Sequence, residues 1–473
     1  MNARISAAEL SQLSQKLESH LGLYFPPERH ADLLKRLAPV ADEFGFDDTA
    51  ECAAWLLKKP LSPREWAVLT EHLTIGETYF FREPAAFDAL RDRILPQIFT
   101  APNRHSRRLR VWSAAASTGE EAYSLAMMLD RLLPKYPGWT ASIFASDVNT
   151  AALERAQRGI FRRWSFRSIP QAYRRDYFSE LPDGTFKIAD RIRRMVSFFP
   201  FNLVRDSYPS YLKQLHDMDV IFCRNVLIYF SAETIATVTE KLTQTLASGG
   251  WLVVSPSEVP HIHGDGLQRH IFGGTTFFQK RAVPISAEKL PPPAAVPRHS
   301  ASVPQTVSVA EIYRRALNFY RQGEYAAVAE ILGEMLTASD GALANQPDAV
   351  QLLVHAYANR RRLAEAEAWC RRAIAAGKLN PRYHYLLATV FEAQNDDAAA
   401  VATLKKTLFL NHNFALAHFT LGSILLRQGN ADAARRHFRA LREILATLSP
   451  ETILAGSDDL TVAALRQMTA HLA

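Results

Sequence analysis

Two neighbouring glutamates, Glu120 and Glu121, stand where many folds bind a phosphate group. They follow a loop of small residues inside the stretch LRVWSAAASTGEEAYSLAMML, which begins as an apolar strand and ends as an amphipathic helix. A strand, a tight loop and a helix N-terminus form the usual phosphate site of nucleotide-binding folds. Two carboxylates would repel a phosphate, although the helix dipole would stabilise either one as an ordinary first-turn residue. The loop is therefore expected to bind a different kind of ligand.

A third acid, Asp147, ends the next predicted strand, SIFASD. An acid at the tip of the second strand of such a fold is placed to accept hydrogen bonds from ribose hydroxyls. A ligand that combines a ribose with positive charge near the first loop satisfies both observations, and S-adenosyl-L-methionine is such a ligand. The GxGxxG motif of dinucleotide sites is missing. We therefore predict S-adenosyl-L-methionine as the cofactor, bound near the two glutamates and Asp147.

Two other polar clusters flank predicted elements of the same region. The segment LTIGETYFFREP places Thr78 and Arg82 ahead of a helix, and a guanidinium can bind a carboxylate through two parallel hydrogen bonds. The segment DVIFCRNVLIYF brings Arg224 and Asn225 to the end of a strand, where polar residues face the ligand crevice. Tyr229 follows in an apolar run and offers a hydroxyl, although a single tyrosine in such a run is more often a core residue.

A parallel sheet would bring these residues together, and the sequence predicts one. Apolar runs with β-branched residues alternate with helical segments, which is typical of an α/β doubly wound sheet covered on both faces. The predicted strands are LRVW, ASIFASD, DVIFCRN and GGWLVVS, and the predicted helices span 121–133, 150–158 and 232–247. Period-two alternation up to Asn202 interrupts this order, so we expect a small antiparallel β insertion at about 176–202.

Helical regions flank the predicted sheet domain, which spans 76–281. Residues 1–75 carry apolar positions at helical spacing and predict an N-terminal all-α domain. Residues 282–308 contain six prolines and almost no large apolar residue, which is typical of a semi-extended linker.

The region after the linker repeats. Small residues recur at a spacing of 34, as in Ala388 and Gly422, and this is the period of tetratricopeptide repeats. We therefore expect a C-terminal α-solenoid of such repeats over 309–446, with an irregular helical bundle as the alternative. A capping helix is expected within 450–473.

Composition and charge narrow the class of protein. The 473 residues have a net charge of +7, and the stretch 155–194 is strongly basic. That stretch is either a solvated surface or a docking face for an acidic partner, and no nucleic-acid-binding motif accompanies it. No apolar run is long enough to cross a membrane, and the first residues lack a signal-peptide core. The three scattered cysteines, without CxxC spacing, indicate a reducing cytoplasm with no disulfide and no metal site.

Taken together, these motifs resemble the CheR-type methyltransferases, which esterify glutamates on bacterial chemoreceptors. The similar blocks occur in the family's order over residues 7–281: GETYFFRE, VWSAAASTGEEAYSLAM, FASDVNTAALERAQRGIF, FPFNLV, IFCRNVLIYF and GGWLVVSPSE. The resemblance implies cofactor contacts at Thr78, Arg82, Glu121, Asp147, Asn202, Leu203, Arg224 and Asn225. Glu121, the second of the pair, corresponds to the family's contact, which leaves Glu120 as a first-turn helix residue. The resemblance also implies that Arg36 reaches the active site and that Tyr229 lies near the transferred methyl group. The catalytic candidates are therefore Arg82 and Arg36, which would orient the substrate carboxylate, and Tyr229, which would assist them.

The resemblance further implies an activity and its partners. The chain would use S-adenosyl-L-methionine to form glutamate γ-methyl esters on the cytoplasmic domain of a methyl-accepting chemoreceptor, leaving S-adenosyl-L-homocysteine. A glutamate carboxylate is ionised at neutral pH, because its ordinary pKa is about 4.3, so no general base is needed. The repeats would bind a further signalling protein, and neither nucleic acid nor membrane insertion is expected.

Three departures from the family pattern leave alternatives open. Gly76 stands where the family usually has an asparagine, the N-terminal region has more acids than bases, and the β insertion is short. The short insertion is similar to the family's version that does not bind a receptor tether peptide. The alternative to an active enzyme is a cofactor-binding scaffold with weak or no turnover, while a small-molecule methyltransferase fits the helical domain and the repeats less well.

Overall fold

The computed structural model describes residues 5–101, 107–210, 215–281, 308–338, 346–360, 362–457 and 460–469. The chain divides into two compact units, each of which is described by itself. The first unit contains Met1–Pro209, Leu215–Lys280 and His418–Ala473, and the second contains Ser210–Gln214 and Arg281–Ala417. In the described residues, no helix combines the length and the apolar character that crossing a membrane requires.

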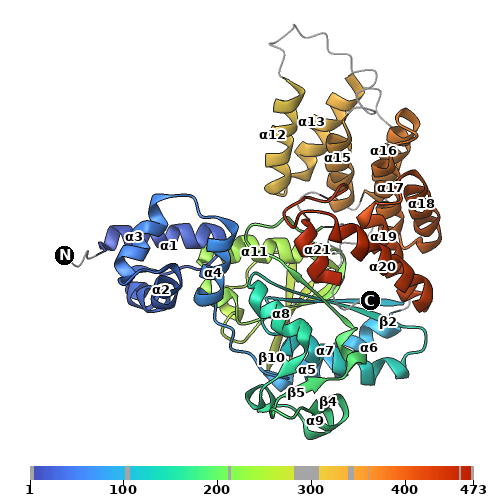
Figure 1. Cartoon of the computed structure of the whole chain (residues 1–473). Helices are drawn as coiled ribbons and strands as arrows, with labels where there is room; N and C mark the ends of the chain where they lie inside the picture. The colour runs from blue at the N-terminus through green and yellow to red at the C-terminus, as the bar shows by residue number, and fades with distance from the viewer. Residues whose placement is uncertain are drawn as a thin grey trace. The chain divides into compact units, whose positions relative to one another are not determined.

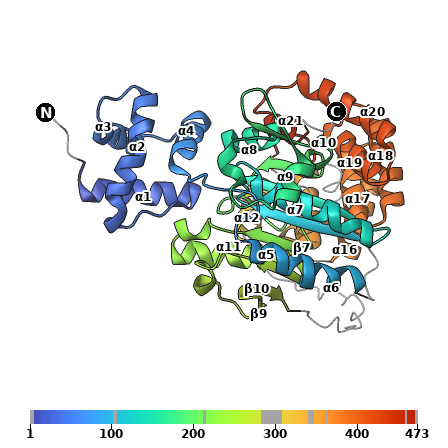
Figure 2. The same cartoon turned by 90° about the horizontal axis from the view of Figure 1, so that it is seen from below.

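A seven-stranded mixed sheet forms the centre of the first unit (Figure 1). Its strands lie in the order β6 (Val196–Pro200), β2 (Thr140–Asp147), β1 (Arg108–Ala114), β7 (Met218–Cys223), β8 (Leu246–Val253), β10 (Thr275–Lys280) and β9 (Leu267–Phe272). The first five strands are parallel, whereas β10 runs antiparallel to both of its neighbours. The predicted α/β sheet is therefore confirmed, and β9 and β10 extend one edge beyond the four strands that we expected (Figure 2).

Helices that precede or connect the parallel strands pack on the sheet. They are α5 (Pro84–Ala89), α6 (Leu95–Thr100), α7 (Glu120–Leu132), α8 (Thr150–Arg158) and α11 (Ala232–Thr245), with a π-helical turn at Leu90–Ile94. All six residues of β7 are buried, as expected for a strand covered on both faces. The carboxyl ends of β1, β2 and β7 lie side by side, so the loops that follow them meet at one edge of the sheet.

A small antiparallel sheet lies between α8 and β6 in the chain. It consists of β3 (Ile160–Phe161), β4 (Phe178–Glu180) and β5 (Phe186–Ile188), with α9 (Gln171–Tyr177) and α10 (Asp190–Arg193) beside them in sequence. Our assignment of the whole stretch up to Asn202 to this insertion was wrong at its end. Residues Val196–Pro200 form β6 and pair in parallel with β2. This edge strand has a partly exposed Ser197 among buried neighbours, and such a pattern is easily taken for the alternation of a half-exposed hairpin.

Four α-helices form the N-terminal region, as the spacing of its apolar residues predicts. They are α1 (Ala7–Leu21), α2 (His30–Phe44), α3 (Thr49–Lys58) and α4 (Pro63–Leu73). Ser6 and Ser62 begin α1 and α4 with capping boxes that satisfy the first free backbone N–H groups. Leucines of α1 and α2 form the centre of a core that also includes Tyr229 at its margin.

Helix pairs occupy the repeat region. The helices are α12 (Val309–Arg321), α13 (Tyr325–Ala338), α15 (Pro347–Asn359), α16 (Leu363–Ala376), α17 (Pro381–Ala393), α18 (Asp397–Leu410), α19 (Ala415–Arg427) and α20 (Ala431–Ala446). A Cβ added to Gly422 would lie 2.7 Å from the Phe438 ring, which explains the small residue at that repeat position. Helix α21 (Val462–Thr469) falls within the predicted capping segment. The predicted linker lies outside the described residues except for Ser308.

Candidate active site

The loops at the carboxyl edge of the sheet have unusual backbone conformations. Ala115 and Ser117, after β1, have positive φ angles of 63° and 50°, and Asn225, after β7, has 59°. Phe81 and Glu83, in the segment before α5, also have positive φ values. Such conformations cost about 1–3 kcal/mol each and persist only where the surrounding structure imposes them. Their concentration in three neighbouring loops marks this edge as the candidate site.

Asp147 ties two of these loops together. One oxygen of its carboxylate accepts a hydrogen bond from the Ser117 backbone N–H (2.8 Å), and the other accepts one from the Asn149 N–H (2.8 Å). Burial raises the pKa of Asp147, and these backbone hydrogen bonds oppose the rise. Each oxygen keeps a second lone pair, so the carboxylate can also accept hydrogen bonds from a ligand in the adjoining cavity.

A cavity opens between these loops and the N-terminal helices; we call it the central cavity. Five of the predicted site residues line it: Asp147, Asn202, Leu203, Asn225 and Tyr229. The remaining lining is mostly small or apolar, and Leu21, Leu23, Thr74 and Ile75 of the N-terminal region contribute to it. The cavity therefore offers an apolar surface with a few polar groups, which is the common composition of a small-molecule site.

Asn202 uses its side chain within the protein. Its amide nitrogen donates to the His20 carbonyl (2.6 Å) at the end of α1, and its oxygen accepts from the Val204 N–H (2.9 Å). The backbone N–H of Tyr24 donates to the Tyr229 carbonyl (2.8 Å). These bonds fix the N-terminal helices against the sheet edge, so both walls of the central cavity are held in place.

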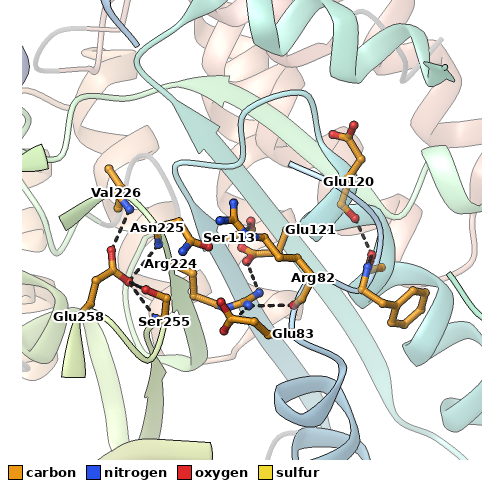
Figure 3. A network of polar contacts seen from close by, with 12 residues as sticks. Arg82, Glu83, Ser113, Glu120, Glu121, Arg224, Asn225, Val226, Ser255 and Glu258 are labelled. Carbon is orange, nitrogen blue, oxygen red and sulfur yellow. Dashed lines mark hydrogen bonds and ion pairs between the residues drawn. The ribbon is translucent and has the colours of Figure 1, made fainter. Parts of the chain in front are cut away.

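Two more predicted residues, Glu121 and Arg224, pair with each other (Figure 3). The Arg224 guanidinium lies 3.0 Å from Glu121 and 2.8 Å from Glu83, and it donates to the Arg82 carbonyl (2.8 Å). The side chain of Arg224 is 1% exposed. Burial raises the pKa of Glu121, and the charge of Arg224 opposes the rise. Two carboxylates against one guanidinium leave an excess of negative charge beside the loop, which suits a cationic ligand.

Glu258 is a central residue of the site that the sequence reasoning missed. Its buried carboxylate accepts hydrogen bonds from the backbone N–H groups of Asn225, Val226, Leu227 and Ser255, at 2.8–3.0 Å, and from the Ser255 hydroxyl. It therefore fixes the turn after β7 that carries Asn225 (Figure 3). The available signal was the block GGWLVVSPSE, which ends with this acid just after a strand.

The positive charges of three arginines act on the Tyr229 hydroxyl. Burial raises the pKa of Tyr229, and the positive charges of Arg36, Arg82 and Arg29 pull it down. Arg36 donates to the Leu73 carbonyl (3.0 Å), and Arg82 donates to a carbonyl of its own loop (2.8 Å). Each of these two guanidiniums keeps further donors, because a guanidinium has five N–H groups. Of the three predicted catalytic residues, Tyr229 alone is among the residues that line the central cavity, while Arg82 and Arg36 act on it through their charge.

Thr78 and Glu120 line a second, adjoining cavity. Glu120 begins α7, as predicted, but it is buried rather than solvated. Its carboxylate accepts hydrogen bonds from the hydroxyls of Thr118 (2.6 Å) and Ser165 (2.9 Å), and burial raises its pKa. Glu120 therefore connects the loop after β1 to the insertion, which is a structural role beyond that of a first-turn residue.

Comparisons with known proteins match two parts of the chain. Residues 76–270 match the family model of the CheR methyltransferase, SAM binding domain, and residues 319–390 match that of the tetratricopeptide repeat. The chain is 33% identical to a chemotaxis protein methyltransferase of Vibrio parahaemolyticus over 54% of its length and 90% of that protein. It is 32% identical to the chemotaxis protein methyltransferase of Escherichia coli, of which it covers 85%.

A longer similarity includes the repeats. The chain is 30% identical to a probable biofilm formation methyltransferase, WspC, of Pseudomonas aeruginosa over 79% of its length and 85% of that protein. Among solved structures, a MamA protein of Desulfovibrio magneticus RS-1 matches 30% of this chain and 77% of its own, with 16% identity and a TM-score of 0.26.

Proposed function

The chain belongs to the CheR family of chemotaxis protein methyltransferases, and from this premise we propose that it methylates glutamate side chains on the cytoplasmic domain of a methyl-accepting chemoreceptor. S-Adenosyl-L-methionine is the cofactor of the matched domain, and S-adenosyl-L-homocysteine would be its product. The observation that carries the proposal is the position of Tyr229 in the lining of the central cavity, where the positive charges of Arg36 and Arg82 act on it. Positive charge at that place suits a carboxylate substrate.

The residues at the central cavity fit a cationic nucleoside. In the lining of the cavity, Asp147 keeps lone pairs that can accept hydrogen bonds from the ribose hydroxyls. Outside the lining, Glu121 and Glu83 set two carboxylates against the one guanidinium of Arg224. Ala115 and Ser117 present backbone at the cavity with little side-chain bulk. When bound, S-adenosyl-L-methionine supplies a methyl group on an electrophilic sulfonium. Asp147 and Glu121 would bind its ribose and amino-acid ends, while Asn225 and Leu203 would contact it from the opposite loops.

The protein's contribution to the reaction would be to position the substrate. A glutamate carboxylate is already ionised at neutral pH and needs no base. Arg82 and Arg36 would orient this carboxylate through charge-assisted hydrogen bonds, and the neutral Tyr229 hydroxyl would donate a third. Exclusion of water by the apolar lining would strengthen these interactions. The expected chemistry is therefore positioning and partial desolvation of an anion, without proton transfer by the enzyme.

A second candidate is a cofactor-binding scaffold with weak or no turnover, and Gly76 motivates it. Gly76 borders both cavities, and a Cβ at this position would make an ordinary contact of 3.4 Å with the Ser117 hydroxyl. A side chain could therefore be accommodated at the cavity mouth, where this chain has none. In either case, we propose that the tetratricopeptide repeats bind a further protein of the same signalling pathway.

Methyl transfer to a receptor fragment tests the proposal. The full chain would be incubated with tritiated S-adenosyl-L-methionine and a chemoreceptor cytoplasmic fragment, and base-labile counts would be measured. We expect counts on the fragment and none on a fragment whose target glutamates are replaced by aspartate. Binding of the cofactor by calorimetry without any base-labile counts would support the scaffold and contradict the enzyme.

A further inference from the structure

The second cavity is a broad surface groove next to the central cavity, and we call it the arginine groove. Its outer wall is formed by Arg155 and Arg158 of α8, Ile160 of β3, Arg162 and Trp164. It shares several lining residues with the central cavity: Thr74, Gly76, Ser117, Asn149 and Ala152. A peptide segment of a substrate that lies in the groove would therefore extend directly into the site of methyl transfer.

The three arginines of the groove form no ion pair with another described residue, whereas four other arginines of the same basic stretch do. Arg155, Arg158 and Arg162 are exposed and form no ion pair with another described residue. Four arginines outside the outer wall form ion pairs: Arg167 with Glu77, Arg175 with Asp176, Arg191 with Asp130, and Arg193 with Asp190. Arg163, Arg174 and Arg194 of the same stretch also form no ion pair with a described residue, so what distinguishes Arg155, Arg158 and Arg162 is their place in the lining of the groove beside the site.

Exposed apolar side chains lie between these charges. Trp164 is 65% exposed and Ile160 is 42% exposed. The Arg167 guanidinium lies over the Trp164 ring at 4.2 Å from its centre, and Arg167 itself contacts Glu77 and the Tyr79 ring, so one face of the indole packs against an anchored side chain. A fixed aromatic surface beside three free cations is the composition of a recognition surface rather than of a solvated helix face.

The acids in the groove do not cancel this charge. Glu77 is paired with Arg167, and the Glu120 carboxylate is buried and hydrogen-bonded to two hydroxyls. Glu71 of α4 is the remaining acid in the lining and is exposed. Three free guanidiniums against one free carboxylate leave the groove basic.

We propose that the arginine groove binds an acidic segment of the protein substrate, adjacent to the glutamate that receives the methyl group. This inference rests on the proposed function, because the segment is identified by its continuity with the site of methyl transfer. Acidic side chains of the segment pair with Arg155, Arg158 and Arg162, and an apolar side chain of the segment packs on Trp164. The groove thus selects glutamates that lie in acidic surroundings and leaves isolated glutamates unmodified.

Charge reversal of the groove tests the inference. In the full chain, Arg155→Glu combined with Arg158→Glu is expected to raise the KM for a receptor cytoplasmic fragment about tenfold, because two attractive contacts become repulsive. The kcat and the cofactor Kd should stay within about twofold, since neither residue lines the central cavity. Trp164→Ala should raise KM about fivefold through loss of packing. The matched control is Arg163→Glu with Arg194→Glu, which reverses two exposed arginines of the same stretch outside the groove.

The outcomes separate this inference from the proposed function. If the wild-type chain forms no base-labile methyl ester, the proposed function fails. If the wild-type chain is active and the groove double variant has the same KM as the control, the groove inference alone fails. A wild-type chain that binds a DNA duplex through Arg155 and Arg158, with methylation of the receptor fragment unaffected by the double variant, would also overturn it. A KM that rises with salt in the wild type, and less in the double variant, supports it.

Discussion

Two groups of charged side chains belong to the candidate site, and they differ in how much of their bonding capacity the protein itself uses. Glu258 and Arg224 are buried and bonded on several sides to the chain. Arg36 and Arg82 each make one hydrogen bond to a carbonyl and keep their other donors. The buried group fixes the shape of the loops, whereas the partly exposed Arg36 and Arg82 keep donors available to a substrate. The same charge chemistry thus has a structural role in one place and a binding role in the other.

This difference predicts different consequences of substitution. Removing a buried charge leaves donors without acceptors and costs stability as well as binding. Removing the charge of the partly exposed Arg36 or Arg82 weakens binding of the substrate and leaves the fold unchanged. The distinction would be contradicted if a variant of Glu258 or Arg224 kept the wild-type stability, or if a variant of Arg36 or Arg82 lost it.

The largest effect is expected for Glu258→Gln. The amide of glutamine would direct its own N–H group at backbone N–H groups that now point to a carboxylate, those of Asn225, Val226 and Leu227 among them. We expect a loss of about 3 kcal/mol in the free energy of unfolding, by analogy with other broken buried charge contacts. Cofactor binding should weaken by a factor of about 100 or more because the turn that carries Asn225 is released.

Chemical denaturation and calorimetry with S-adenosyl-L-methionine measure these two effects. Glu233→Gln, an exposed acid in the first turn of α11, is the control and should change both by little. An unfolding free energy within 0.5 kcal/mol of wild type, roughly the range of a surface substitution, would show that Glu258 does not fix the turn.

Arg82→Lys is expected to have the next largest effect, on catalysis only. A lysine keeps the charge but cannot form two parallel hydrogen bonds to a carboxylate. The kcat/KM for methyl-ester formation should fall about 100-fold, which corresponds to about 2.7 kcal/mol. The melting temperature should match that of Arg93→Lys, an exposed arginine of the following helix. Near-normal ester formation by Arg82→Lys would show that Arg82 contributes only its positive charge.

Asp147→Asn should weaken cofactor binding without abolishing the fold. The carboxylate accepts the N–H groups of Ser117 and Asn149 on different oxygens, and an asparagine has one oxygen to offer. We expect the Kd for S-adenosyl-L-methionine to rise about 30-fold, from the lost hydrogen bond and the lost charge together. Asp265→Asn, an exposed acid, is the control in the same calorimetric titration. Unchanged affinity would place the ribose contact elsewhere.

The parts of the site that the sequence predicted are those that follow from strand ends. Asp147 and Asn225 stand at the carboxyl ends of β2 and β7, and parallel strands bring such positions to one edge. Small residues at one repeat spacing likewise predicted the helix pairs, because close helix contacts require them. These features depend on local pattern and on the direction of the strands, both of which can be read from a single sequence.

The parts that could not be predicted depend on contacts between distant segments. The pairing of Glu121 with Arg224 joins residues 103 positions apart, and Glu258 meets the turn after β7 across about thirty positions. The spacing of residues within one segment does not indicate which distant segment it will contact. The same limit explains β6, since the parallel pairing of Val196–Pro200 with β2 is decided by the sheet and not by the alternation of its own residues.

The smallest effect is expected for Tyr229→Phe, and its pH dependence separates it from the arginines. Burial raises the pKa of Tyr229 above its ordinary value of about 10, so its hydroxyl stays a neutral donor throughout the range in which the substrate carboxylate is ionised. Loss of one neutral donor should lower kcat about fivefold. Because the Tyr229 hydroxyl does not ionise below about pH 10, the wild-type and Tyr229→Phe rates should stay parallel from pH 6 to 9.5. Rates of methyl-ester formation across this range check the prediction. A wild-type rate that falls above pH 8 while the variant's does not would show that the nearby arginines outweigh burial and ionise the tyrosine.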